Sequence, residues 1–280
     1  MAKFTYAEKI MIPISEYTWK EFKNYCLETQ FHPGTIFRGQ SNCEWHLDPS
    51  YTRFIDGSNF RKYFEIILPE AKRLVASYID YDFDLTSQDD QNRLIGLLQH
   101  HGFPTPLLDW TNSPYVAAYF AFIDIAYREP ESDYIAVWLF NAEYSVRFIE
   151  EKLCECPFHI ILPDHRFNKR LLAQDGLFTL SLSPLSLDEE LSPIMDELDH
   201  PGLLQKVIIP VEESRFALKD LSLMGIHAGN LFEGIDGVCK RLKDHFFMES
   251  ETALSPRGKR LINAALSRLS GGKKNIKRSK

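Results

Sequence analysis

Arg38 and a group of polar residues between positions 99 and 113 are the side chains of this sequence best suited to chemistry. Arg38 follows the apolar run 35–37 and precedes Gly39. A guanidinium offers several donors to a phosphate, and a glycine beside it lets a backbone come close. We therefore expect a strand that ends in an anion-binding turn, with a surface arginine in an ordinary turn as the structural alternative.

The second polar group lies in residues 99–122, which read QHHGFPTPLLDWTNSPYVAAYFAF. Two prolines favour extended backbone before them, so a helix predicted over 91–100 ends there. Ser113-Pro114 is typical of a helix N-cap followed by a first-turn proline, and it predicts a helix over 115–127. We expect residues 109–113 to form a polar loop held between rigid elements, where functional residues often lie.

Each of these side chains also has a structural interpretation. His100 and His101 at a helix end can bond the terminal carbonyls, and no third residue has the spacing of a metal ligand. Asp109 can brace its loop by accepting backbone hydrogen bonds. Trp110 and Tyr119 can belong to the core. Five irregularly spaced cysteines form no disulfide framework and are typical of a reducing cytoplasm.

The elements that must position these residues alternate irregularly along the chain. Apolar periodicity and turn signals predict helices over 17–30, 59–79, 91–100, 115–127, 212–224 and 238–242, and strands over 35–37, 45–47, 133–139, 177–181 and 206–211. Pro69 is expected to kink the helix over 59–79 or to divide it in two. Residues 141–165 are irregular, with a candidate helix over 148–154. Residues 182–200, rich in Ser, Pro and acid, predict a surface insertion. Short strands among helices favour an α+β fold with a split, antiparallel or mixed sheet flanked by helices.

Charge separates an acidic body from a basic tail. The net charge is -7, yet residues 255–280 hold nine of the 32 Lys and Arg and none of the 39 Asp and Glu, which leaves -16 on the rest. Such a body is a poor nonspecific ligand for nucleic acid, whereas the tail can contact phosphates or an acidic partner, or simply be solvated. Within the tail, apolar positions at helical spacing predict a short amphipathic helix; they are Leu261, Ala264, Ala265 and Leu269. No apolar run is long enough to cross a membrane and no secretory leader is present, so we expect a cytoplasmic protein.

Several motifs together resemble the FRG domain family, named for its Phe/Tyr-Arg-Gly motif. They are Phe37-Arg38-Gly39, Gln99-His100-His101-Gly102-Phe103-Pro104-Thr105, Leu107-Leu108-Asp109-Trp110-Thr111, Ser113-Pro114, Arg170-x-x-x-Gln174-x-Gly176-x-Phe178, Gly225-Ile226 and Leu231-Phe232-x-x-Ile235-Asp236-Gly237. This chain departs from the family pattern at Pro106, where the family usually has Arg, and at Glu233-Gly234. The resemblance implies a helical lead-in over 1–34, a domain over 35–245 and a basic tail over 246–280.

The FRG arrangement is in turn similar to the ADP-ribosyltransferase fold, and this likeness implies NAD as the cofactor. Breaking the bond between nicotinamide and ribose builds positive charge on the ribose, as in glycoside cleavage. The reaction needs a cation on the pyrophosphate, polar groups on the ribose, an aromatic wall and a carboxylate. The implied NAD-binding residues are Arg38, Gly39, Gln40, His101, Asp109, Trp110, Thr111, Ser113 and Tyr119. The implied catalytic residues are Arg38 and either Glu233 or Asp236.

Three functions therefore stand open from the sequence. The first is an NAD-dependent ADP-ribosyltransferase that acts as a toxin or antiphage effector, for instance in a toxin-antitoxin system, on an intracellular nucleic acid or protein. The second is a noncatalytic module that binds a nucleotide or nucleic acid, which Pro106 and the unsettled late acid keep open. The third is a regulatory protein whose acidic body and basic tail bind a partner such as an antitoxin or chaperone.

Overall fold

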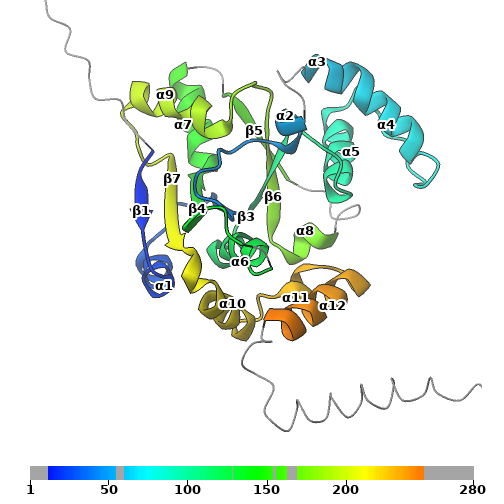
Figure 1. Ribbon diagram of the computed structural model, residues 1–280. Helices are drawn as coiled ribbons and strands as arrows, with labels where there is room; N and C mark the ends of the chain where they lie inside the picture. Colours follow the sequence, from blue (N-terminus) through cyan, green and yellow to red (C-terminus); the bar gives the residue numbers. More distant parts are fainter. Residues whose placement is uncertain (1–11, 55–59, 128, 154–155, 163–168, 249–280) are drawn as a thin grey trace, which may run out of the picture.

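A mixed seven-stranded sheet forms the centre of this computed structural model, which describes residues 12–54, 60–127, 129–153, 156–162 and 169–248 (Figure 1). In order across the sheet, the strands are β1 (Ile14–Glu16), β7 (Leu204–Pro210), β4 (Tyr134–Asn141), β2 (Thr35–Gln40), β3 (Leu107–Thr111), β6 (Gly176–Ser181) and β5 (Phe158–Ile161). β1 is parallel to β7, and the other neighbours are antiparallel. The predicted α+β fold with a mixed sheet flanked by helices is confirmed. The basic segment 255–280 and its predicted helix lie outside the described residues.

The sheet is a single open sheet, but its centre is weakly joined. β2 pairs with β4 over six positions, from Thr35 opposite Asn141 to Gln40 opposite Ala136. On its other side β2 pairs with β3 at one position, Phe37 opposite Thr111. The predicted split is therefore present only as a loose junction between β2 and β3.

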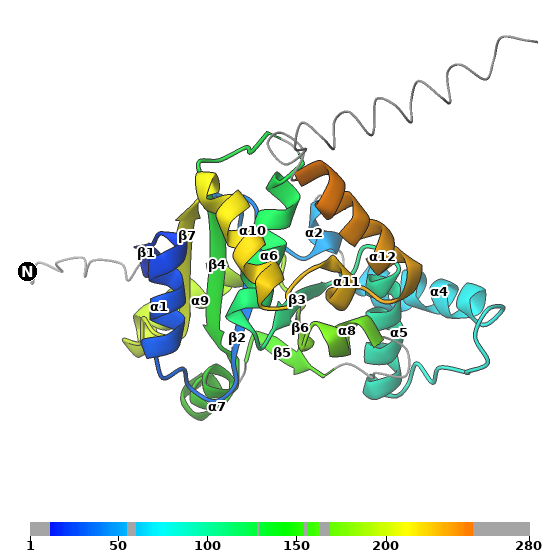
Figure 2. The same cartoon turned by 90° about the horizontal axis from the view of Figure 1, so that it is seen from below.

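One face of the sheet is covered by α1 (Trp19–Glu28), α6 (Pro114–Ile125) and α10 (Ser214–Leu223) (Figure 2). α6 begins as predicted, since Ser113 accepts a hydrogen bond from the backbone N–H of Val116 and Pro114 occupies the first turn. Its apolar residues extend around the helix because it is buried among the sheet, α1 and α10. After α10, Gly225 turns the chain at φ 82° into α11 (Ala228–Leu231) and α12 (Gly234–Lys243).

The opposite face is covered by α7 (Ala142–Leu153) and α9 (Leu187–Leu198). The surface insertion predicted over 182–200 is wrong, because α9 buries Leu187, Leu191 and Met195 against the sheet. Ser186 and Glu189 form a capping box, and the acidic first turn favours the helix N-terminus. The Ser and acidic residues of this segment are therefore signals of a helix start rather than of a loop.

A third core lies beside β3, β6 and β5, under α2 (Ser50–Phe54), α3 (Phe60–Lys62), α4 (Leu68–Val75), α5 (Gln88–His100) and α8 (Lys169–Ala173). The helix predicted over 59–79 is interrupted by a π-helical turn, Tyr63–Ile67. The turn ends two residues before Pro69, whose missing N–H breaks the regular ladder. In the figure these helices lie together at one end of the sheet (Figure 1).

Four further local predictions are wrong. Residues 45–47 form no strand; the segment is a loop whose Leu47 N–H donates to Asp188. Residues 141–165 contain α7 and β5 instead of irregular chain, and α7 includes residues 148–153 of the candidate helix. Arg38 lies inside β2, not after it, because β2 stays paired with β4 as far as Gln40. Asp109 to Thr111 belong to β3 and not to a loop, because they pair with Gly176–Phe178 of β6.

Candidate functional site

Arg38 lies at the loose junction of the sheet. Its Nη1 donates to the backbone carbonyl of Asp109 at 2.7 Å, across the space beyond the single pair of β2 and β3. The same nitrogen lies 3.9 Å from Oδ2 of Asp109, at the limit of a salt bridge. The Arg38 Nε is buried without a hydrogen-bond partner, and the side chain is 18% exposed. The guanidinium therefore has donor capacity left over.

Burial acts against the charge of this guanidinium. Loss of hydration lowers the pKa of Arg38, while the negative charge of Asp109 raises it in part. A buried cation without a matched partner is costly, so a bound anion would stabilise the folded protein.

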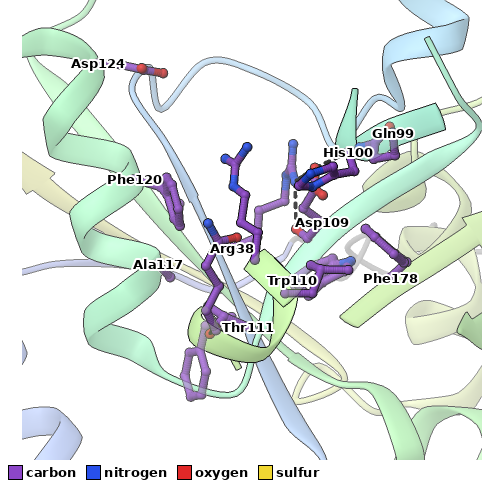
Figure 3. A pocket seen from close by; sticks show the side chains of 15 residues that line it. Arg38, Gln99, His100, Asp109, Trp110, Thr111, Ala117, Phe120, Asp124 and Phe178 are labelled. Atoms are coloured by element: carbon purple, nitrogen blue, oxygen red, sulfur yellow. Dashed lines mark hydrogen bonds and ion pairs between the residues drawn. The ribbon is translucent and has the colours of Figure 1, made fainter. Parts of the chain in front are cut away.

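Arg38 opens into a cavity of about 270 Å³. Its lining residues come from β2, α5, β3, α6, α8 and β6, and they are Phe37, Arg38, Gly39, Gln99, His100, Asp109, Trp110, Thr111, Ala117, Phe120, Asp124, Arg170, Leu171, Gln174 and Phe178. Figure 3 shows Ala117, Phe120 and Asp124 of α6 on one side and Gln99, His100 and Asp109 on the other. The cavity thus combines an apolar wall with a polar, partly charged one.

Arg170 brings a second guanidinium to this cavity. It lies over the ring of Phe232, at 4.3 Å from the ring centroid, and the Lys240 Nζ is 3.4 Å from the same centroid. Burial lowers the pKa of Arg170, and Asp109 and Asp236 raise it in part. Within the described residues, Arg170 has no carboxylate at salt-bridge distance. Two arginines therefore share one cavity with the carboxylates of Asp109 and Asp124, and Arg38 pairs with Asp109 only at the 3.9 Å limit of a salt bridge.

Asp109 is held in a fixed orientation by a short chain of hydrogen bonds. Gln99 donates from Nε2 to Oδ2 of Asp109 at 2.8 Å. Thr105 donates its hydroxyl proton to Oε1 of Gln99, so the amide oxygen and nitrogen of Gln99 have distinct partners. The Asp109 side chain is 54% exposed and can reach a ligand.

The predicted hydroxyl residues build the local backbone. Thr111 donates to the carbonyl of Gln174 at 2.7 Å and accepts from the N–H of Ser113 at 3.1 Å. Ser113 caps α6 and is not among the cavity-lining residues. These hydroxyls hold the end of β3, the start of α6 and the segment before β6 together. The hydroxyl proton of Thr111 is therefore already used, and Ser113 lies outside the cavity lining.

Gly39 and Trp110 line the cavity, but each has a clear structural task. A Cβ on Gly39 would lie 1.9 Å from the carbonyl oxygen of Ala117, so the glycine admits α6 rather than a ligand. The Trp110 indole donates to Thr179 at 2.9 Å and packs in the core on the opposite face, with Phe140. Its ring is therefore not an available stacking surface.

Three other predicted binding residues lie outside the cavity lining. Gln40 is buried, accepts from the Trp138 indole at 2.6 Å and donates to a loop carbonyl. Tyr119 belongs to the core beside the sheet, where burial raises its pKa. His101 is the exposed C-cap residue of α5.

The two predicted catalytic carboxylates, Glu233 and Asp236, also lie outside the cavity lining. Glu233 is the N-cap residue of α12, and Asp236 lies in the first turn of that helix; both are exposed. Asp236 is close enough to Arg170 to raise its pKa in part. The carboxylates that line the cavity are those of Asp109 and Asp124.

Sequence reasoning assigned no role to several residues that line the cavity. Among them are Arg170, Gln174 and Phe178, spaced four residues apart. They stand together in one of the motifs quoted above, and Gln99 and His100 stand in another. Their place in a shared motif was therefore the signal that could have identified these residues. The spacing of residues in the sequence did not predict that α8 and β3 would line the same cavity.

Comparison with known proteins supports the family resemblance over part of the chain. Residues 33–129 match the FRG domain. This FRG segment contains β2, α5, β3 and α6 and supplies both Arg38 and Asp109, whereas Arg170 and Gln174 lie beyond it. No curated protein and no solved structure matches the chain. The likeness to the ADP-ribosyltransferase fold therefore stays a prediction.

None of the described helices is both long and apolar enough to traverse a bilayer. In the same part of the chain, no three His, Cys, Asp or Glu residues are grouped as metal ligands.

Proposed function

We propose that this chain binds NAD in the cavity between β2, β3 and α6 and transfers its ADP-ribose to an intracellular nucleic acid or protein. The observation that carries the proposal is that Arg38 and Arg170 line one cavity, where Arg38 is mostly buried with an unpartnered Nε and Arg170 has no carboxylate at salt-bridge distance within the described residues. Guanidinium forks bind phosphate oxygens through paired, charge-assisted hydrogen bonds. A diphosphate matches two such cations better than a single carboxylate does.

The size and walls of the cavity fit part of such a ligand. About 270 Å³ is near the lower end of the roughly 300–1,000 Å³ that small-molecule sites enclose. The cavity would hold the diphosphate and an adjoining ribose, with the rest of the dinucleotide extending outwards. Phe120 supplies apolar surface beside the sugar.

In this proposal Asp109 is the carboxylate that serves the reaction. Nicotinamide leaves with the electron pair of its bond to ribose, and positive charge develops on the sugar. Asp109 lies in the cavity, where its negative charge would stabilise that state, and Gln99 fixes its direction. An acceptor nucleophile then bonds to the ribose carbon and passes its proton to the Asp109 carboxylate, which returns it to solvent. Glu233 and Asp236 lie outside the cavity and would act, if at all, through Arg170.

A second candidate is a noncatalytic nucleotide-binding module. It is favoured by the position of Glu233 and Asp236 outside the cavity and by the engagement of Asp109 with Gln99. Both candidates require the two arginines to bind phosphate. They differ in whether nicotinamide is released.

Calorimetric titration with NAD and with ADP, together with an assay for released nicotinamide, tests both candidates. We expect Arg38→Gln to lose binding of both ligands. Arg61→Gln is the matched control, because Arg61 is 82% exposed and pairs with Glu65 on α3 and the π-turn. Asp109→Asn should keep binding and lose nicotinamide release. Binding without release would leave the second candidate, and no binding of either nucleotide would overturn both.

Acceptor labelling and toxicity test the proposed biological role. Radiolabelled NAD mixed with cellular RNA, DNA and protein should transfer label to one of these classes. Expression in a bacterial host should slow growth, and Arg38→Gln should restore it. Toxicity that survives Arg38→Gln would separate the effect on growth from this cavity.

A further inference from the structure

Helix α12 packs with its charged side against the rest of the protein. Lys243 lies over the ring of Tyr127 at 3.7 Å, and the hydroxyl of Tyr127 donates to Asp244 just after the helix. Lys240 lies over Phe232 in the same way. The buried residue of α12 is Gly237, where a Cβ would lie 2.1 Å from the carbonyl oxygen of Phe232.

The apolar side of α12 faces outwards instead. Ile235 is 73% exposed, Val238 51%, Leu242 49% and Phe246 62%. Their spacing of three, four and four residues places them along one stripe, which we call the α12 stripe. Cys239, also exposed, adjoins it. In the views of Figures 1 and 2, α12 lies at the outer edge of the molecule beside α11.

This arrangement is the reverse of the usual surface helix. An amphipathic helix normally turns its apolar stripe to the core and its charges to water. A continuous exposed apolar patch marks a contact with another surface. Every residue of the α12 stripe is about half exposed or more, so the described residues leave it largely uncovered.

The chain itself continues directly from this helix. The described part ends at Met248, two residues after Phe246, and the sequence then carries Leu261, Ala264, Ala265 and Leu269 at helical spacing. Residues 249–260 can span at most roughly 40 Å when extended. The stretch from Ile235 to Phe246 is about 17 Å long at helical rise. The linker is therefore long enough for the chain to turn back along α12.

Charge also favours an intramolecular contact. Residues 255–280 carry nine Lys and Arg and no Asp or Glu, while the rest of the chain has a net charge of -16. A basic segment tethered to a body of net negative charge is held near that body by electrostatic attraction and by a high effective concentration. The α12 helix itself carries Lys240, Arg241 and Lys243, so the contact with the stripe would rest on its apolar residues. A second copy of the chain would instead bring two acidic bodies together.

We propose that residues 261–269 form a helix that packs its apolar side on the α12 stripe of the same chain. The C-terminal segment would thereby cover Ile235, Val238, Leu242 and Phe246. This inference does not depend on what the cavity binds.

Disulfide trapping in the full-length protein tests the contact. Ala265→Cys would place a thiol on the apolar side of the predicted helix, within reach of Cys239 beside the stripe. Asn263→Cys is the matched control, because position 263 lies on the opposite side. Under mild oxidation at low protein concentration, we expect the link between positions 239 and 265 to form several-fold faster than that between 239 and 263, within single chains. Equal rates would overturn the proposal, and links found only between two chains would replace it with a swapped dimer.

Limited proteolysis gives a second, independent readout. Val238→Ser with Leu242→Ser should release the segment and speed tryptic cleavage after Arg260 and Arg268 several-fold. Leu223→Ser is the control, since Leu223 is 81% exposed on α10, away from the stripe. The substitutions are at exposed positions, so the fold should tolerate them. Unchanged cleavage in the double variant would also overturn the proposal.

Discussion

Helices α6 and α12 each have a very close backbone contact at a glycine, α6 with strand β2 and α12 with the residue Phe232 that precedes it, yet their surroundings differ. At α6 the carbonyl oxygen of Ala117 comes so near to Gly39 of β2 that a Cβ there would lie 1.9 Å away. At α12 the glycine is in the helix, and Gly237 meets the carbonyl oxygen of Phe232. α6 is enclosed by the sheet, α1 and α10, whereas the outer side of α12 is an exposed apolar stripe. A close glycine contact therefore fixes a helix firmly only where other elements of the structure also pack on that helix.

The largest effect is expected from Gly39→Ala. The new methyl group would overlap backbone of an enclosed helix, so we expect a loss of roughly 3 kcal/mol or more in the free energy of unfolding. Urea denaturation measures this loss. Gly96→Ala is the control: its Cβ would lie 3.4 Å from a Phe178 ring atom in the interior of α5, where alanine favours the helix. A neutral result for Gly39→Ala would mean that α6 is free to move.

A smaller effect is expected from Gly237→Ala. The overlap with Phe232 is similar, but α12 can move outwards because few described residues cover it. We expect a loss of about 1 kcal/mol, together with faster hydrogen exchange confined to α11 and α12. A loss as large as that of Gly39→Ala would show that the two helices are equally fixed.

Tyr127→Phe should weaken α12 without touching its glycine. The change removes the hydroxyl that donates to Asp244 and leaves the ring under Lys243 in place. We expect a loss of about 1 kcal/mol or less in the free energy of unfolding. Tyr78→Phe serves as the control, since that side chain is 90% exposed. If both variants unfold alike, the hydroxyl contributes nothing to holding α12.

The smallest effect is a pH dependence near α12. His227 precedes α11, and burial lowers its pKa, with the charge of Arg241 acting in the same direction and that of Asp244 opposing it. The folded state therefore binds fewer protons than the unfolded one, so stability is complete at neutral pH and falls as pH drops through about 6.5. Hydrogen exchange corrected for its intrinsic pH dependence should rise in α11 and α12 at pH 5.5 but not in α6. His227→Gln should remove the difference.

Local signals predicted much of the fold, and long-range placement accounts for what they missed. The N-cap at Ser113 and the apolar run at 206–211 act within a few residues, so their elements were readable. Asp109 was misplaced in a loop because its strand is defined by pairing with Phe178, distant in sequence. Arg170 lies on the same cavity as Arg38 only because of the order of the strands in the sheet. The spacing of residues in the sequence does not reveal that order. The resemblance nevertheless singled out both segments before their meeting was visible.

The single residue pair between β2 and β3 has a mechanical consequence. Arg38 belongs to the half of the sheet that runs from β1 to β2, and Arg170 precedes β6 in the other half. A molecule bound by both guanidiniums would bridge the junction between β2 and β3 and hold the two halves of the sheet together. A ligand bound in the cavity would then reduce the motion of strands that do not contact it.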